Sequence, residues 1–143
     1  MDVCNKTGDS AAVAELFYAL IAAGRIDDAV ALAAPDFVGH GLGGREELKD
    51  ELEMWAAAFP DVDITIEDTI AEGDRVAVRM RVHGTHTGTF AGMTATGRPF
   101  DVRCTDVVRI VEGHVAEAWP LLDLAGLLVQ VGRMPTARNR ELE

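Results

Sequence analysis

The spacing of apolar positions predicts helices in the first half of the chain and mostly strands in the second. Up to Gly24, apolar residues recur every three to four positions, as in a helix that buries one face, and Asp9 or Ser10 can cap its start. Beyond Pro60, β-branched residues alternate with polar ones, which is typical of strands with one buried face. The predicted helices span residues 10–24, 26–33, 45–59 and 124–131, and the predicted strands span 62–70, 76–83, 100–111 and 114–122, with a brief strand or turn at 36–40.

Helices followed by a run of antiparallel strands predict an α+β domain, with the helices packed on one face of a curved sheet. At 143 residues, the chain is expected to form one domain. We place this domain at residues 10–132, between a disordered N-terminal tail at 1–9 and a flexible C-terminal tail at 133–143.

Charge and composition exclude several classes of partner. The formal net charge of −11 disfavours binding to nucleic acid and to anionic membrane surfaces. No apolar run reaches the roughly 20 residues of a membrane span, and the first ten residues lack the features of a signal peptide, so we expect a cytoplasmic protein. Two cysteines, Cys4 and Cys104, make neither a disulfide framework nor a metal site, and we expect no bound metal.

The pairing of the last two strands predicts a pocket. A two-residue turn at 112–113 would join these strands and place Asp106 opposite Trp119. Because side chains alternate along a strand, one face should then carry four residues together: Asp106, Glu117, Trp119 and Asp123. Acids among apolar groups are typical of a binding pocket, although a register shift of one residue would separate them.

Three stretches carry a resemblance to a known family. They are Ala58-Phe59-Pro60-Asp61, residues 82–88 together with 96–98, and residues 109–132, which include Glu117-Ala118-Trp119. Over roughly residues 13–132 the chain resembles the SnoaL-like polyketide (ester) cyclases. This resemblance implies the conical α+β barrel of nuclear transport factor 2 and ketosteroid isomerase, in which a curved antiparallel sheet wraps around N-terminal helices.

The same resemblance implies a cofactor-independent enzyme that closes a ring on an apolar polyketide-like intermediate. The reaction would be an intramolecular aldol closure of the lyase or isomerase type, in antibiotic biosynthesis, and the enzyme a homodimer by analogy. In such cyclases an aspartate near the end of the last strand is the acid/base catalyst, and Asp123 matches it. A family histidine matches His86, which could polarise a carbonyl group or carry a proton. Asp123 could instead only cap the helix that follows it.

The remaining candidate residues are predicted to contact substrate: Tyr18, His40, Trp55, Phe59, Met80, Asp106, Glu117 and Trp119. Trp119 and Met80 would form a dry wall of the pocket, although many relatives carry tryptophan in place of Met80. Core packing is the alternative role of the aromatic residues on the helices, and a structural ion pair is the alternative role of the two acids.

Two other functions fit the same pocket. Acids clustered with an arginine could activate water to open an epoxide or hydroxylate a substrate, as in relatives of limonene epoxide hydrolase. The domain could also be a non-catalytic module for small-molecule binding or dimerisation, in which the acids are structural.

Overall fold

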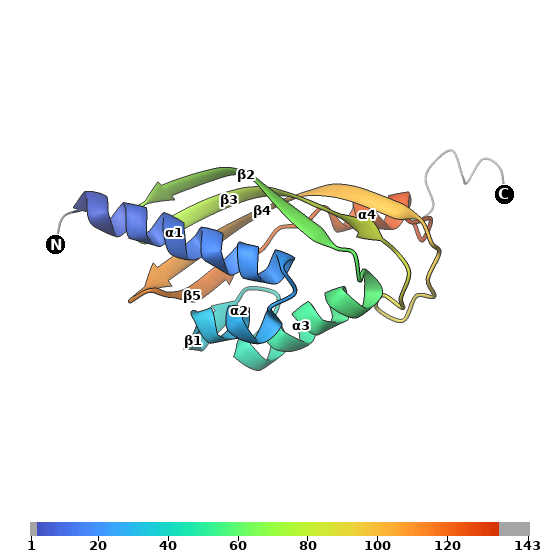
Figure 1. Cartoon of the computed structure of the whole chain (residues 1–143), viewed down its shortest axis with the longest axis horizontal. Coiled ribbons are helices and arrows are strands. Elements are labelled where there is room, and N and C mark those ends of the chain that lie inside the picture. The colour runs from blue at the N-terminus through green and yellow to red at the C-terminus, as the bar shows by residue number, and fades with distance from the viewer. Residues whose placement is uncertain (1–2, 135–143) are drawn as a thin grey trace.

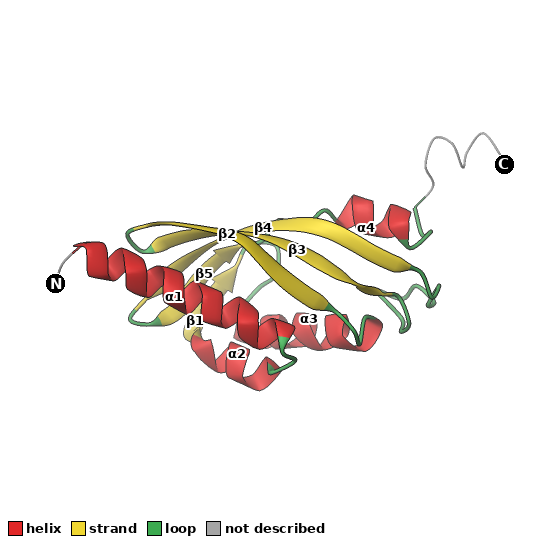
Figure 2. Ribbon diagram, turned by 45° about the horizontal axis from the view of Figure 1, so that its top comes forward, coloured by secondary structure: helices red, strands yellow, loops and turns green. Residues whose placement is uncertain are grey.

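The computed structural model describes residues 3–134, and the side chains of residues 8–134. The described chain forms a curved five-stranded sheet with helices against its inner face (Figure 1, Figure 2). The helices are α1 (Val3–Ala22), α2 (Ile26–Leu32), α3 (Arg45–Ala58) and α4 (Leu124–Gln130). The strands are β1 (Ala33–Gly39), β2 (Asp63–Glu72), β3 (Arg75–Thr85), β4 (Pro99–Val111) and β5 (His114–Trp119).

The strands lie in the order β1-β5-β4-β3-β2. Neighbours run antiparallel, except that β1 pairs in parallel with β5. Figure 2 shows α1 crossing the inner face of the sheet, with α2 and α3 beside β1. The predicted α+β architecture is therefore confirmed, and the segment expected to be a brief strand or turn is a full strand at the edge of the sheet.

The inner face of the sheet forms the core because apolar side chains alternate with polar ones. In β3, Val76, Val78 and Met80 are buried whereas Arg79 and Arg81 are exposed, as the sequence pattern predicts. β4 follows the same pattern from Phe100 to Ile110. Two of its outward residues form ion pairs with neighbouring strands, Asp101 with Arg81 of β3 and Arg109 with Glu117 of β5. Phe17 and Tyr18 of α1 pack against this face.

An extra residue in β5 changes the predicted hairpin register. The turn at residues 112–113 forms, but Arg109 pairs with Glu117, so Ala116 is a bulge residue without a partner on β4. A shift of one residue reverses the face on which every following side chain lies. The prediction of one shared acidic face is therefore wrong: Asp106 lies on the inner face, whereas the outside of the sheet carries Glu117, Trp119 and Asp123.

The shifted register continues beyond the end of β5. Cys104 forms an isolated bridge with Leu122, and the backbone N–H of Asp123 donates to the carbonyl oxygen of Arg103 at 3.0 Å. Leu122 consequently faces inward with Cys104, and Leu121 is 72% exposed. Asp123 pairs with a residue whose side chain points outward, which explains its own exposure.

The ends of the domain differ in how far the structure tests them. α1 begins at Val3, earlier than the cap expected at Asp9 or Ser10. The predicted C-terminal tail falls largely on residues 135–143, which lie outside the described residues.

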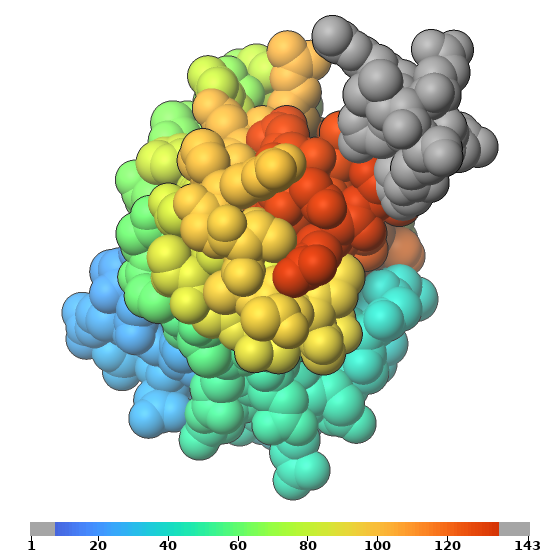
Figure 3. Space-filling view, turned by 90° about the vertical axis from the view of Figure 1, so that its right-hand side faces the viewer, coloured from blue at the N-terminus to red at the C-terminus, as the bar shows by residue number. Residues whose placement is uncertain are grey.

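Figure 3 views the end of the molecule where the loop at residues 86–98 lies beside α4, and there Arg133 donates to the carbonyl oxygen of Thr94 at 2.5 Å. No helix within residues 3–134 is long and apolar enough to cross a membrane.

Candidate active site

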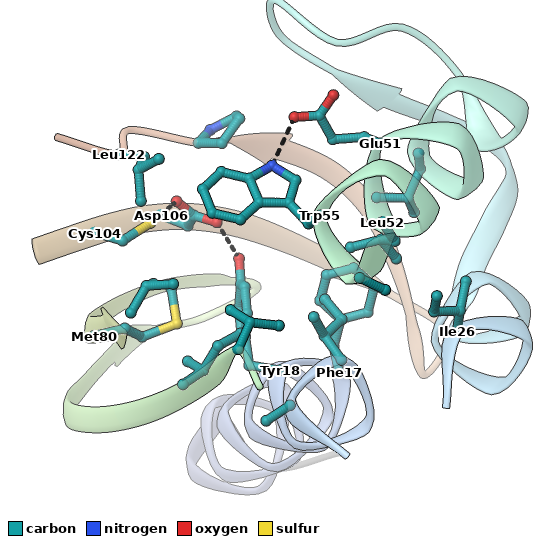
Figure 4. A pocket seen from close by; sticks show the side chains of 18 of the residues that line it. Phe17, Tyr18, Ile26, Glu51, Leu52, Trp55, Met80, Cys104, Asp106 and Leu122 are labelled. Carbon is teal, nitrogen blue, oxygen red and sulfur yellow. Dashed lines mark hydrogen bonds between the residues drawn. The ribbon is translucent and has the colours of Figure 1, made fainter. Parts of the chain in front are cut away.

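A cavity of about 440 Å³ lies between the first three helices and the inner face of the sheet. Its wall is mostly apolar, as expected for a small-molecule site. Figure 4 shows side chains from α1, α3, β3 and β4 converging on it. Five side chains bring nitrogen, oxygen or thiol groups to the wall, and these are Tyr18, Glu51, Trp55, Cys104 and Asp106.

Asp106 supplies the buried acid of this cavity. The residue is 8% exposed, and it is the only buried acid among the described residues. It accepts hydrogen bonds from Tyr18 Oη at 2.7 Å, from Cys104 Sγ at 3.1 Å and from the backbone N–H of Leu121 at 3.1 Å. All three donors reach the same carboxyl group, which satisfies the hydrogen-bonding needs of a buried polar side chain. The third bond forms in the observed register, in which the carbonyl oxygen of Leu121 accepts a hydrogen bond of 3.0 Å from the backbone N–H of Thr105.

Burial keeps two of these donors protonated. The pKa of the Tyr18 hydroxyl is raised well above its usual value, mainly because the group is buried and also because the negative charge of Asp106 lies close to it. Burial, followed by the charge of Asp106, likewise raises the pKa of the Cys104 thiol. Both groups therefore remain hydrogen-bond donors at physiological pH.

A second acid enters the cavity from α3. Glu51 is half-buried, and its Oε1 accepts a hydrogen bond of 3.0 Å from the indole N–H of Trp55 one turn later. Trp55 belongs to an aromatic cluster, because its ring also contacts Phe59 and Phe90 at centroid distances of 5.1 and 5.4 Å. This packing fixes the indole, and the indole in turn orients Glu51.

Four of the ten residues predicted for the site line the cavity: Tyr18, Trp55, Met80 and Asp106. Phe59 and His86 lie outside this lining and are fully buried against each other, with ring centroids 5.7 Å apart. The Nδ1 atom of His86 lies 3.2 Å from Thr96 Oγ1, and among the described residues no partner reaches its Nε2 atom.

Three other predicted residues form a polar cluster on the outer face of the sheet. His40 Nε2 lies 2.6 Å from Glu117 Oε2, and Arg109 donates to Glu117 Oε1 at 3.0 Å. The ring of His40 stacks on Trp119 with centroids 5.0 Å apart. These hydrogen bonds, first from His40 and then from Arg109, lower the pKa of Glu117. The ion pair expected for Glu117 is thus present, away from the cavity.

Asp123 occupies the N-cap of α4. Its exposed carboxylate accepts a hydrogen bond of 2.9 Å from the backbone N–H of Gly126. It does not line the cavity. Asp123 therefore has the alternative role considered from the sequence, that of a helix cap.

Two features of the site were missed from the sequence. Glu51 precedes Trp55 by four residues, and this spacing on one helix face could have identified it. The backbone N–H of Leu121 could not be identified, because its position depends on the bulge at Ala116.

Comparison with known proteins assigns the family. The sequence model of the SnoaL-like polyketide cyclases matches residues 11–131. A nogalonic acid methyl ester cyclase from Streptomyces nogalater is 29% identical over 118 residues, which cover 76% of this chain and 87% of the relative.

Solved structures agree with this assignment. AclR from Streptomyces galilaeus, for which hydroxylase activity is proposed, superposes with a TM-score of 0.82 at 27% identity. The match covers 90% of this chain and 99% of AclR. IdmH from Streptomyces antibioticus, for which polyketide cyclase activity is proposed, superposes with a TM-score of 0.76 at 29% identity. The match covers 86% of this chain and 98% of IdmH. These superpositions confirm the conical α+β barrel. The chain belongs to the SnoaL-like polyketide cyclase family.

Proposed function

We propose that the cavity is the active site of a cofactor-independent cyclase that closes a ring in an apolar polyketide-like substrate by an intramolecular aldol reaction. The observation that carries this proposal is the buried carboxylate of Asp106, with its three hydrogen-bond donors, in a mostly apolar cavity. We assign the role of general base to Asp106. The earlier assignment to Asp123 stays a prediction, and the exposed position of that residue speaks against it.

The proposed reaction begins with proton removal. An oxygen of Asp106 takes a proton from a carbon atom next to a carbonyl group, and the resulting enolate attacks a second carbonyl carbon of the same molecule. The proton on Asp106 then passes to the alkoxide oxygen of the product. No atom is gained or lost, so the product is an isomer of the substrate. Proton transfer by a positioned side chain typically contributes about 10² to 10⁴-fold in rate.

Tyr18 is the proposed donor to the oxygen that gains negative charge. Its hydroxyl donates to the Asp106 carboxylate in the free protein. A protonated carboxyl group is a weaker acceptor than a carboxylate, so proton transfer to Asp106 releases the Tyr18 hydroxyl toward the enolate oxygen. Ketosteroid isomerase likewise uses a tyrosine hydroxyl to hold an enolate oxygen.

The hydrolase alternative is supported less well. Water activation for epoxide opening was expected from acids clustered with an arginine. The cavity lining formed by the described residues contains no arginine. Arg79, Arg81 and Arg109 pair with acids on the outer face of the sheet.

Nogalonic acid methyl ester, the compound named for the relative from Streptomyces nogalater, is the substrate for the first test. The purified protein should convert it in buffer without added cofactor to a product of unchanged mass. A substrate deuterated at the carbon atom that Asp106 deprotonates should lose one deuterium from that carbon, because the new carbon–carbon bond takes its place and the deuterium passes to an exchangeable hydroxyl group. A product heavier by one water molecule, with oxygen from solvent, would favour the hydrolase, and binding without conversion would favour the non-catalytic module.

A further inference from the structure

The side-chain donors of the cavity are already engaged by its own acids. The hydroxyl of Tyr18 and the thiol of Cys104 both donate to Asp106. The indole N–H of Trp55 donates to Glu51. Among the described lining residues, these are the only side-chain N–H, O–H and S–H donors besides any proton on the acids themselves. The empty cavity therefore offers a ligand acceptors and no free side-chain donor.

The described charged residues that line the cavity are all acidic. Its described lining contains two acids, Glu51 and Asp106, and no lysine, arginine or histidine. An anionic group inside this apolar cavity would lose its hydration without gaining a cationic partner, which carries a large free-energy cost. A cationic group would instead meet two carboxylates and the faces of aromatic rings, which attract cations.

Glu51 has an acceptor left for a ligand. Trp55 occupies its Oε1 atom, and no other described residue donates a hydrogen bond to its Oε2 atom. The side chain belongs to α3, whereas Asp106 belongs to β4, so the two acids belong to different walls of the cavity. Figure 4 shows the Trp55 indole between the two acids, with the Glu51 carboxylate at the indole N–H and Asp106 on the side of Tyr18 and Cys104.

We propose that Glu51 is a specificity residue that accepts a hydrogen bond from a hydroxyl or ammonium group of the substrate, and that the cavity takes neutral or cationic apolar ligands and rejects anionic ones. This inference rests on the proposed function only in that it takes the cavity to be the substrate site. It adds a second polar contact, on a different element from Asp106, that the assignment of Asp106 as the base does not require.

Three probes of similar size but different charge test the proposal at neutral pH. They are 2-(aminomethyl)naphthalene, which is a cation, 2-(hydroxymethyl)naphthalene, which is neutral, and 2-naphthoate, which is an anion. Binding is followed by NMR of methionines labelled with ¹³C at the methyl group. Met80 lines the cavity, so its signal, assigned with Met80→Leu, reports binding at this site.

For the wild-type protein, we expect the amine to bind at least about tenfold more tightly than the carboxylate, with the alcohol between them. Glu51→Gln keeps an acceptor for the Trp55 indole but removes the charge. It should weaken amine binding about tenfold and leave alcohol binding within about twofold of wild type. Glu53→Gln is the matched control, because Glu53 lies on the same helix, is exposed and does not line the cavity. This control should leave the binding of all three probes unchanged.

Two results would overturn the inference alone: equal affinity for the carboxylate and the amine, or the same loss of amine binding in Glu51→Gln and Glu53→Gln. A Met80 signal that no probe shifts would overturn both the inference and the proposed function. The two failures are therefore distinguishable.

Discussion

Tyr18 on α1 and Asp106 on β4 are 88 residues apart in the sequence and are joined by a buried hydrogen bond of 2.7 Å. The bond links the first helix to the strand at the centre of the sheet, and it lies in the wall of the cavity. The donor stays protonated because burial and the charge of Asp106 raise the pKa of Tyr18. The same contact therefore serves the packing of α1 and the chemistry proposed for Asp106.

Replacing Tyr18 by phenylalanine should lower both stability and turnover. Tyr18→Phe removes one of the three donors to a buried carboxylate, which costs about 2 kcal/mol of unfolding free energy. It also removes the proposed donor to the enolate oxygen, so kcat should fall about 100-fold with little change in KM. Urea denaturation and steady-state kinetics measure the two effects. A stable variant with wild-type kcat would remove Tyr18 from the mechanism.

Cys104 should resist alkylation in the folded protein. Only a thiolate reacts with iodoacetamide, and burial together with the charge of Asp106 raises the pKa of this thiol. In a Cys4→Ser background, alkylation followed by mass spectrometry at pH 8 should be at least about 100-fold slower in buffer than in unfolding concentrations of urea. Equal rates in the two conditions would show that the thiol is accessible and that Asp106 is not shielded as described.

The contribution of Glu117 to stability should depend on pH. Hydrogen bonds from His40 and Arg109 lower its pKa in the folded state. A lowered pKa gives a contribution that is present above the unfolded value of about 4.3 and is lost as the pH falls through the folded value. Glu117→Gln should therefore be less stable than wild type at pH 6, and the difference should shrink toward pH 3. Urea unfolding across this range measures it, with exposed Glu15→Gln as the control.

The sequence was sufficient to predict the elements whose apolar spacing is regular. The alternation in β3 and β4 identifies their inner faces, and the two-residue turn at 112–113 forms where expected. The parallel pairing of β1 with β5 joins segments about 80 residues apart, and nothing in the local pattern specifies it.

The error in the predicted site arose because the pairing of β4 with β5 is shifted by one residue from the predicted register. The predicted pairing would turn Leu121 inward, and the observed pairing turns Leu122 inward. Because both are leucine, the hydrophobic pattern fits either register. The bulge residue Ala116 follows Val115 directly, and neither glycine nor proline marks the bulge. Asp123 was consequently expected in the cavity, whereas Asp106 lies there in both registers.

Asp106, and not Asp123, is the acid/base residue in the proposed reaction. Turnover of Asp106→Asn and of Asp123→Asn in the cyclisation assay distinguishes the roles of the two aspartates. Asparagine caps a helix as well as aspartate does, so Asp123→Asn should keep both the fold and wild-type turnover, whereas Asp106→Asn should lose about 10² to 10⁴-fold in kcat. Wild-type turnover in Asp106→Asn, or a comparable loss in a stably folded Asp123→Asn, would show that the acid/base role is wrongly assigned to Asp106 alone.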